Sequence, residues 1–158
     1  MIEIRTAILA DAQLIFDFIV ELAVYEKAEH EVVTSVAEIA VTLFGPAAKA
    51  HALVCMVDGK PAGYAVYFYN YSTWLGRNGI WLEDVYVTPA QRGRGAGKAI
   101  LKHVAGIAVQ ENCGRFEWSV LDWNTPAIEF YEALGARPLD EWTIYRVTGD
   151  ALSKLASS

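Results

Sequence analysis

Residues Gln91 to Ile100 read QRGRGAGKAI and bring glycines and cations together in one short stretch. The glycines are spaced two apart and alternate with basic side chains: Gly93, Gly95 and Gly97 with Arg92, Arg94 and Lys98. Glycine lifts the steric limits on the backbone, so that successive N–H groups can converge on a bound anion. The stretch therefore predicts a loop that binds phosphate.

Two common phosphate motifs do not fit this stretch. A P-loop ends in Gly-Lys followed by Ser or Thr, but here Ala99 follows Gly97 and Lys98. Its leading glycine is replaced by Arg92. The dinucleotide fingerprint needs a third glycine where this chain has Lys98, and it normally opens the first strand–helix unit of a domain. Nucleotide hydrolysis and dinucleotide binding are both disfavoured.

The bulk composition is that of an ordinary globular protein. The chain has 158 residues, of which 54% are hydrophobic and 20% are charged, with a formal net charge of -6. That length predicts one domain covering residues 1–158. The start, Met1-Ile-Glu-Ile-Arg5, is charged, and no apolar run reaches the roughly 18 residues needed to span a bilayer. We expect a soluble, cytoplasmic protein with no membrane partner.

Cysteine and histidine give no sign of a metal site. Cys55 and Cys113 lack the paired spacing of zinc ligands, and the histidines, His30, His51 and His103, are scattered singly. We expect two inert thiols and no metal.

The charge is unevenly distributed along the chain. Between Thr88 and Gln110 there are four cations and no carboxylate, so every acidic residue lies elsewhere. Nucleic acid requires a broad basic face, which this acidic chain lacks. A local basic patch fits a small polyanionic cofactor, and the acidic remainder can attract a cationic substrate.

Hydrophobic periodicity predicts the first half of the fold. A strand over Ile2–Arg5 precedes a helix that begins at Asp11, its expected N-cap. A capping box at Ser35 to Glu38 opens a second helix that stops near Gly45-Pro46. A β-hairpin follows, with strands at 51–57 and 64–71 around the turn Asp58-Gly59.

The second half continues with alternating strands and helices. The predicted elements are a strand at 80–87, the glycine loop, a helix with a buried stripe, a strand at 115–120, a helix capped by Thr125 and ended by Gly135, a strand at 142–147, and a short helix after Asp150. The glycine loop thus joins a strand to a helix N-terminus, whose unpaired N–H groups and partial positive charge also favour an anion.

This order of elements resembles that of the GNAT superfamily of acyl-CoA-dependent N-acetyltransferases. QRGRGAG is similar to the Q/R-x-x-G-x-G/A pyrophosphate loop of that family, with Gln91 or Arg92 at its start and Gly95 and Ala96 within it. The segments ELAVYEKAE, WLEDVYV, RGRGAGKAILKHVA and DWNTPAIEFYEALGA resemble the spermidine/spermine and thialysine N-acetyltransferase branch. The resemblance covers residues 2–152 and implies an α/β fold with a mixed, mostly antiparallel sheet flanked by helices.

The resemblance also implies which residues bind acetyl-CoA as cosubstrate. The pantetheine arm would pair with the backbone of the strand before the loop, much as another strand would. The loop would bind the pyrophosphate, and the mouth of the following helix would supply further contacts. The implied residues are Val85, Tyr86, Val87, Gln91, Arg92, Gly93, Arg94, Gly95, Ala96, Gly97, Lys98, Asn124, Ala127 and Tyr131. A flexible turn at the loop, and a simple turn residue at Asn124, are the alternatives.

Glu83 is the candidate general base. Strand alternation places Trp81, Glu83, Val85 and Val87 on one face, and a carboxylate among apolar neighbours requires a reason. An ammonium group must lose a proton before it can attack a thioester. The resemblance gives that task to Glu83, directly or through water. The alternative is a carboxylate paired with a cation, and Asp84, expected on the opposite face, is the weaker candidate.

Tyr131 is the candidate general acid. The sequence N-x-P-x-x-x-F-Y resembles that of the family, in which the tyrosine protonates the departing thiolate. A phenol with a pKa near 10 is protonated at neutral pH and can donate to sulfur. The alternative is that Phe130 and Tyr131 simply pack in the core.

The substrate amine is expected near Tyr25 and Glu26, which match a tyrosine–glutamate pair of this branch. Without the resemblance, YEKAEHE would be a solvated helix end. The register of Asp140 and Glu141 is uncertain, because this chain is one residue shorter here than its relatives. The sequence therefore leaves a polyamine, a diamine and a thialysine- or lysine-like amine open as substrates.

The leading interpretation is an enzyme that acetylates a small primary amine by direct transfer in a ternary complex. No cysteine is placed to form a covalent intermediate. A protein or peptide N-acetyltransferase and a non-catalytic acyl-CoA-binding module are the alternatives, and the second would have no need of Glu83 and Tyr131. The relatives further suggest a homodimer.

Overall fold

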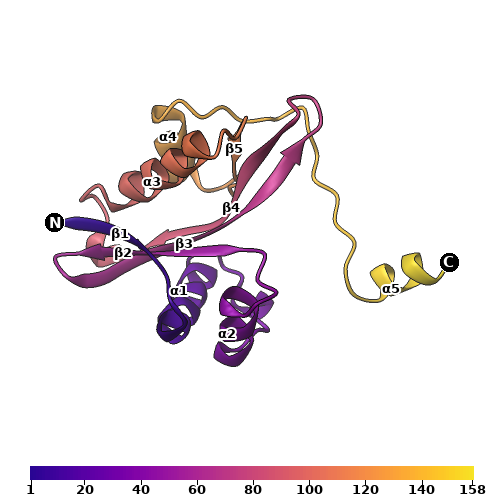
Figure 1. Cartoon of the computed structure of the whole chain (residues 1–158), viewed down its shortest axis with the longest axis horizontal. Coiled ribbons are helices and arrows are strands. Elements are labelled where there is room, and N and C mark those ends of the chain that lie inside the picture. The colour runs from indigo at the N-terminus through magenta and orange to yellow at the C-terminus, as the bar shows by residue number, and fades with distance from the viewer. The chain divides into compact units, whose positions relative to one another are not determined.

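A five-stranded sheet forms the centre of the first part of the chain, as the computed structural model of all 158 residues shows (Figure 1). Its strands lie side by side in chain order: β1 (Ile2–Thr6), β2 (His51–Val57), β3 (Lys60–Ser72), β4 (Arg77–Val87) and β5 (Phe116–Glu117). The first four strands pair antiparallel with one another, and β5 is parallel to β4. The predicted mixed, mostly antiparallel sheet is confirmed.

Helices cover both faces of this sheet (Figure 1). Two of them, α1 (Ala12–Tyr25) and α2 (Val36–Phe44), lie on one face, and α3 (Ala96–Gln110) lies on the other. Short 3-10 turns occupy η1 (Leu9–Asp11), η2 (Glu29–Glu31) and η3 (Pro89–Gln91). The predicted α/β class with helices flanking the sheet is confirmed.

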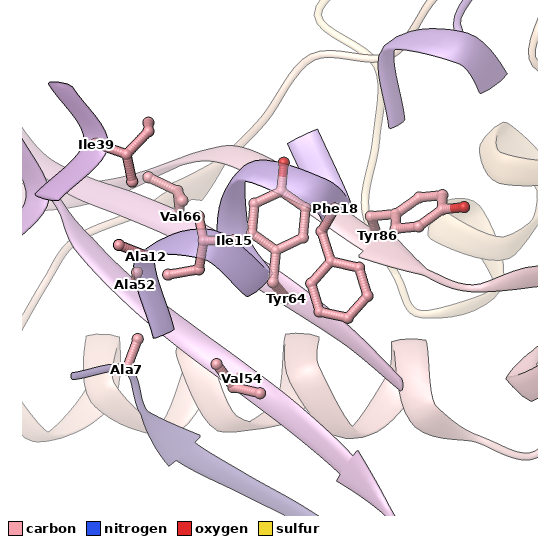
Figure 2. Close-up of a cluster of buried hydrophobic side chains, with 10 residues drawn as sticks. All are labelled: Ala7, Ala12, Ile15, Phe18, Ile39, Ala52, Val54, Tyr64, Val66 and Tyr86. Carbon is pink, nitrogen blue, oxygen red and sulfur yellow. The ribbon is translucent and has the colours of Figure 1, made fainter. Parts of the chain in front are cut away.

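A buried hydrophobic cluster joins α1 and α2 to the sheet (Figure 2). Ile15 and Phe18 from α1 and Ile39 from α2 contact strand residues that include Tyr64 and Tyr86. Ile15 and Tyr64 are fully excluded from solvent. This packing fixes the position of α1 relative to β3 and β4, where the candidate site lies.

The contacts within the chain define two units, Met1–Ser119 and Val120–Ser158. The first contains the whole sheet with α1, α2 and α3. The second contains α4 (Thr125–Ala133) and α5 (Gly149–Ser157). No helix in either unit combines the length and apolar character that a membrane span requires.

Local signals in the sequence produce several of these elements as expected. Ser35 and Glu38 form the predicted capping box at the start of α2, with the Ser35 hydroxyl accepting from the Glu38 N–H at 3.2 Å. The turn between β2 and β3 has positive φ at Asp58 and Gly59, 51° and 76°, as a type I′ hairpin turn requires. Gly135, with a φ of 92°, follows the end of α4.

One predicted helix cap is confirmed in position only, and another is wrong. Asp11 occupies the N-cap position of α1, but its side chain does not cap that helix. Its carboxylate instead accepts two hydrogen bonds from Arg5, at 2.7 and 2.8 Å, and one from the Ile8 N–H. In α4 the cap is Asn124 rather than Thr125, because the Asn124 side chain accepts from the Ala127 N–H at 3.4 Å.

The strand predictions near the C-terminus are also wrong. The predicted strand at 115–120 is reduced to the two residues of β5, and the predicted strand at 142–147 has no regular structure. A strand exists only by pairing, and the unit that contains residues 142–147 has no sheet. Trp142, Ile144 and Tyr145 are accordingly exposed.

Candidate active site

The segment Gln91–Lys98, called the phosphate loop below, connects β4 to α3. Gly93 and Gly95 have positive φ, 74° and 89°, which L side chains rarely adopt. Gly95 is the N-cap of α3, so the N–H groups of the first helical turn have no carbonyl partner in their own helix. The two glycines are therefore required by the backbone, and the loop ends in a helix N-terminus suited to an anion.

Arg92 links the phosphate loop to the end of α1. Its Nε donates to the Val87 carbonyl at 2.9 Å, and its guanidinium lies over the rings of Tyr25 and Tyr86, 4.8 and 5.5 Å from their centroids. The Tyr86 hydroxyl in turn donates to Glu21 of α1 at 3.0 Å. These contacts fix the loop against the helix that carries Tyr25 and Glu26.

Arg94 links the same loop to the β2–β3 turn. It donates to the Gln91 side chain and to Asp58, each at 2.7 Å. Asp58 also accepts from the amino group of Met1. The N-terminal ammonium and the Arg94 guanidinium lower the pKa of Asp58 to about 2.

One edge of β4 is open next to the phosphate loop. β5 pairs with β4 only at Ile80 and Trp81, so no strand covers this edge from Leu82 to Val87. The stretch contains Val85, Tyr86 and Val87, whose backbone is expected to bind the pantetheine arm. An extended chain of amides can pair with such an edge.

A β-bulge at Glu83 overturns the predicted alternation of β4. Val66 is opposite Asp84 and Tyr67 is opposite Leu82, which leaves Glu83 without a partner on β3. Consecutive residues of β3 point to opposite faces, so Leu82 and Asp84 do as well. The prediction that Trp81, Glu83, Val85 and Val87 share one face is therefore wrong.

The bulge places Asp84 on the face of α1, beside Glu83. The Asp84 carboxylate accepts a hydrogen bond from the Tyr64 hydroxyl at 2.8 Å. Burial raises the pKa of Asp84, the Tyr64 hydrogen bond lowers it, and the charge of Glu83 raises it. The expectation that Asp84 lies on the face opposite the site is wrong.

Glu26 completes a group of three acidic side chains, Glu26, Glu83 and Asp84, called the carboxylate group below. Glu26 is the C-cap of α1, and its pKa is raised by burial and by the charge of Asp84. None of the three makes an ion pair. Glu83 accepts instead from the Trp81 indole N–H at 3.1 Å, so the alternative that a cation pairs with Glu83 does not hold.

Three of the residues implied by the resemblance lie in the second unit, at the start of α4 and within it. Asn124 and Ala127 are bonded to one another in the helix cap. Tyr131 lies one turn further along α4, with its ring centroid 5.6 Å from that of Phe130. The roles of these residues in cofactor binding and acid catalysis stay predictions.

Sequence reasoning missed two features of the site. The sequence marks Tyr64 only as one aromatic residue of a hairpin, and regular alternation predicts that Asp84 points away from Glu83. No local signal marks the bulge or the cross-strand hydrogen bond. The consecutive acids Glu83 and Asp84 in an otherwise apolar strand were the available hint.

Comparisons with known proteins agree with this architecture. The model of the acetyltransferase (GNAT) family matches residues 18–136. A thialysine N-epsilon-acetyltransferase from Sus scrofa is 42% identical over 97% of this chain and 96% of its own. An L-ornithine N5-acetyltransferase from Arabidopsis thaliana is 43% identical over 62% of this chain and 43% of its own.

Solved structures share the fold as well. An integron cassette protein from the mobile metagenome of V. cholerae superposes with a TM-score of 0.82, at 28% identity, over 99% of this chain and 98% of its own. A possible acetyltransferase from Clostridium difficile gives a TM-score of 0.76 at 25% identity, over 94% of this chain and 98% of its own. The chain belongs to the GNAT acetyltransferase family, and it is an N-acetyltransferase.

Proposed function

We propose that this chain transfers the acetyl group of acetyl-CoA to a small primary amine, directly and within a ternary complex. The observation that carries the proposal is the carboxylate group, three acidic side chains without a cationic partner, beside an open strand edge. Glu26 and Asp84 are partly buried, and Glu83 is exposed. A partly buried carboxylate without a counter-ion is disfavoured, and an incoming ammonium group would supply the missing charge.

The basic half of the site supports acetyl-CoA as the donor. The phosphate loop offers helix N-terminal N–H groups and cations to the pyrophosphate, from Gly93 to Lys98. The open edge of β4 offers backbone groups at Val85, Tyr86 and Val87 to the pantetheine arm. Gln91 belongs to the same loop, and Asn124 and Ala127 of the second unit are proposed as further cofactor contacts because the resemblance implies them.

In the proposed reaction the neutral amine attacks the thioester carbonyl carbon. The N–C bond forms and the C–S bond breaks, so that the products are the acetylated amine and CoA. Glu83 receives the proton that the ammonium group loses before attack, directly or through water. Tyr131 protonates the departing thiolate, and the second proton, which the nitrogen loses as the amide forms, returns to the tyrosine through solvent. Tyr25 and Glu26 hold the substrate. No step requires a metal ion or a covalent acetyl-enzyme.

The amine that we favour has two cationic centres. Relatives similar to this chain are named for thialysine and L-ornithine, which are both amino acids with a primary amine at the end of the side chain. A spermidine/spermine N(1)-acetyltransferase-like protein is 30% identical over 98% of this chain. More than one carboxylate near the reacting position suits a substrate that carries more than one ammonium group.

The test is the release of free thiol from acetyl-CoA on addition of thialysine, lysine, ornithine, 1,4-diaminobutane, spermidine or spermine. We expect turnover with at least one of these amines. Faster turnover with lysine-containing peptides would favour a peptide acetyltransferase. Binding of acetyl-CoA without thiol release from any amine would favour a binding module.

The proposal includes a cytoplasmic homodimer with neither nucleic acid nor membrane as partner. Trp142, Ile144 and Tyr145 expose apolar side chains, and covering them with a second copy of the chain would favour self-association. Light scattering on the eluting peak of a sizing column tests the dimer. A monomer at micromolar concentration would contradict it.

A further inference from the structure

The starting point is a polar atom within the hydrophobic cluster between α1 and the sheet. Tyr64 is fully excluded from solvent, and its ring stacks on Phe18 of α1 with 5.7 Å between centroids and 11° between planes (Figure 2). A phenol at such a position needs a hydrogen-bond partner. Its hydroxyl donates to Asp84 at 2.8 Å.

The position of Asp84 depends on the fold at two places. The bulge at Glu83 turns Asp84 toward α1. Phe18 of α1 stacks on the ring of Tyr64, and the Tyr64 hydroxyl contacts Asp84. The same helix ends at Tyr25 and presents Glu26 as its C-cap. One helix thus places Glu26 directly and Asp84 through Tyr64.

We propose that the Tyr64 hydroxyl is a positioning group of the amine site, which orients the Asp84 carboxylate so that Asp84 and Glu26 together bind an ammonium group of the substrate. This inference rests on the proposed function and adds to it a residue that does not itself touch the substrate. Tyr64 acts only through Asp84.

The hydroxyl has two physical effects on Asp84. It holds one carboxylate oxygen, which restricts rotation and leaves the other oxygen for a ligand. It also stabilises the ionised carboxylate, since hydrogen bonding to the charged form lowers its pKa, here against the opposing effects of burial and of Glu83. The charged groups facing Asp84 are Glu83 from β4 and Glu26 from α1, and Arg92 lies further along, over Tyr86.

The direct test is Tyr64→Phe, which removes the hydroxyl and keeps the ring that stacks on Phe18. We expect the KM for the amine to rise about threefold to tenfold, with the KM for acetyl-CoA unchanged. The acid limb of kcat/KM for the amine should move to higher pH, because Asp84 without its donor takes up a proton more readily. A loss of packing alone would not move this limb.

Tyr67→Phe is the matched control. Tyr67 lies three residues further along β3, is also buried, and points to the opposite face of the sheet. We expect its amine KM and its pH profile to equal those of the wild type. Thermal melts of both variants establish that they are folded.

The Asp84→Asn variant tests whether the Tyr64 hydroxyl acts through Asp84 or through a general effect on the core. We expect this variant to raise the amine KM more than Tyr64→Phe does, and the double variant to match Asp84→Asn alone. Full additivity of the two changes would overturn the inference. So would a Tyr64→Phe variant with the amine KM and pH profile of the wild type.

Calorimetric titration with 1,4-diaminobutane tests the same inference without turnover. Weaker binding to Tyr64→Phe than to the wild type supports it, and equal binding, or none to the wild type, overturns it. A wild-type chain that binds the diamine but releases no thiol would refute the proposed function and leave the binding role of Tyr64 standing.

Discussion

The phosphate loop and the carboxylate group lie close to one another in the first unit, yet they are constructed in opposite ways. The loop is a continuous segment whose glycines, cations and helix start are all local in the sequence. The carboxylate group takes one residue from α1 and two from β4, and it depends on a hydroxyl from β3. The first can be recognised from sequence, whereas the second exists only after folding.

The two regions also differ in how their charges are balanced. In the loop, Arg92 and Arg94 already have protein partners, namely the Val87 carbonyl, two aromatic rings and Asp58. In the carboxylate group, no acidic side chain has a cationic partner. The cations of the loop are therefore held by the protein itself, while the carboxylate group has no counter-ion within the chain.

The largest effect should come from the acidic region, through Glu83→Gln. General base catalysis contributes about 10² to 10⁴ in rate, so turnover should fall by that factor at neutral pH. It should recover in part as pH rises, because more of the amine then arrives already deprotonated. The measurement is kcat against pH, with acetyl-CoA affinity determined separately. An equal loss at every pH would mean that Glu83 positions the substrate.

Tyr131→Phe provides the contrast to that profile. Loss of the acid should also lower turnover by about 10² to 10⁴. No recovery at high pH is expected, since the thiolate lacks its proton whatever the state of the amine. Turnover equal to that of the wild type would assign Tyr131 to packing with Phe130.

In the basic region the largest effect should come from Gly95→Val. A β-branched residue at a φ of 89° is strained, and the loop should leave the conformation that the helix start requires. We expect acetyl-CoA to bind about 10- to 100-fold more weakly by calorimetry, in line with about 1–3 kcal/mol of strain. Gly106→Ala, inside α3 where an added Cβ meets nothing, is the control and should leave binding unchanged.

A smaller effect is expected from Glu26→Gln at the end of α1. Partial exposure weakens its attraction for an ammonium group, so the KM for the amine should rise about threefold to tenfold while that for acetyl-CoA stays constant. Glu29→Gln, three residues away and exposed, is the control. Equal changes in both Michaelis constants would show that Glu26 acts through the structure of the helix end.

These experiments also test how far the sequence could predict the molecule. The strands at 51–57 and 80–87, the α2 cap at Ser35 and a helix after the glycine loop follow from local signals, and the structure contains them. Residues 142–147 contain the aromatic and β-branched residues typical of a strand, but they meet no sheet edge within their unit. Periodicity predicts a strand only where a partner strand exists.

The candidate site shows the same division between local and tertiary information. Gly93 and Gly95 could be recognised as loop residues because glycine adopts positive φ at little steric cost, and both do so here. The face of the sheet on which Asp84 lies could not be predicted, because a single extra residue in β4 reverses it. The Arg92 contacts with Tyr25 and Tyr86 likewise join residues distant in sequence.

The smallest effect should come from Asp58→Asn, which alters the loop through Arg94 alone. Asp58 competes with a bound pyrophosphate for the Arg94 guanidinium and adds a negative charge near it. Because the pair is exposed, we expect acetyl-CoA to bind only about two- to fivefold more tightly to the variant, and less so at high salt.

The pH dependence of that effect follows from the lowered pKa of Asp58, about 2. A carboxylate whose pKa is depressed in the folded state is ionised throughout neutral and mildly acidic solution, and its contribution is lost only as pH falls through that value. The ratio of the acetyl-CoA dissociation constants of the wild type and Asp58→Asn should therefore be constant from about pH 5 to 8. Asp17→Asn, whose carboxylate contacts only Gln13 of its own helix, should match the wild type. Weaker binding to Asp58→Asn would reverse the interpretation, because Asp58 would then hold Arg94 in place for the phosphates rather than compete for it.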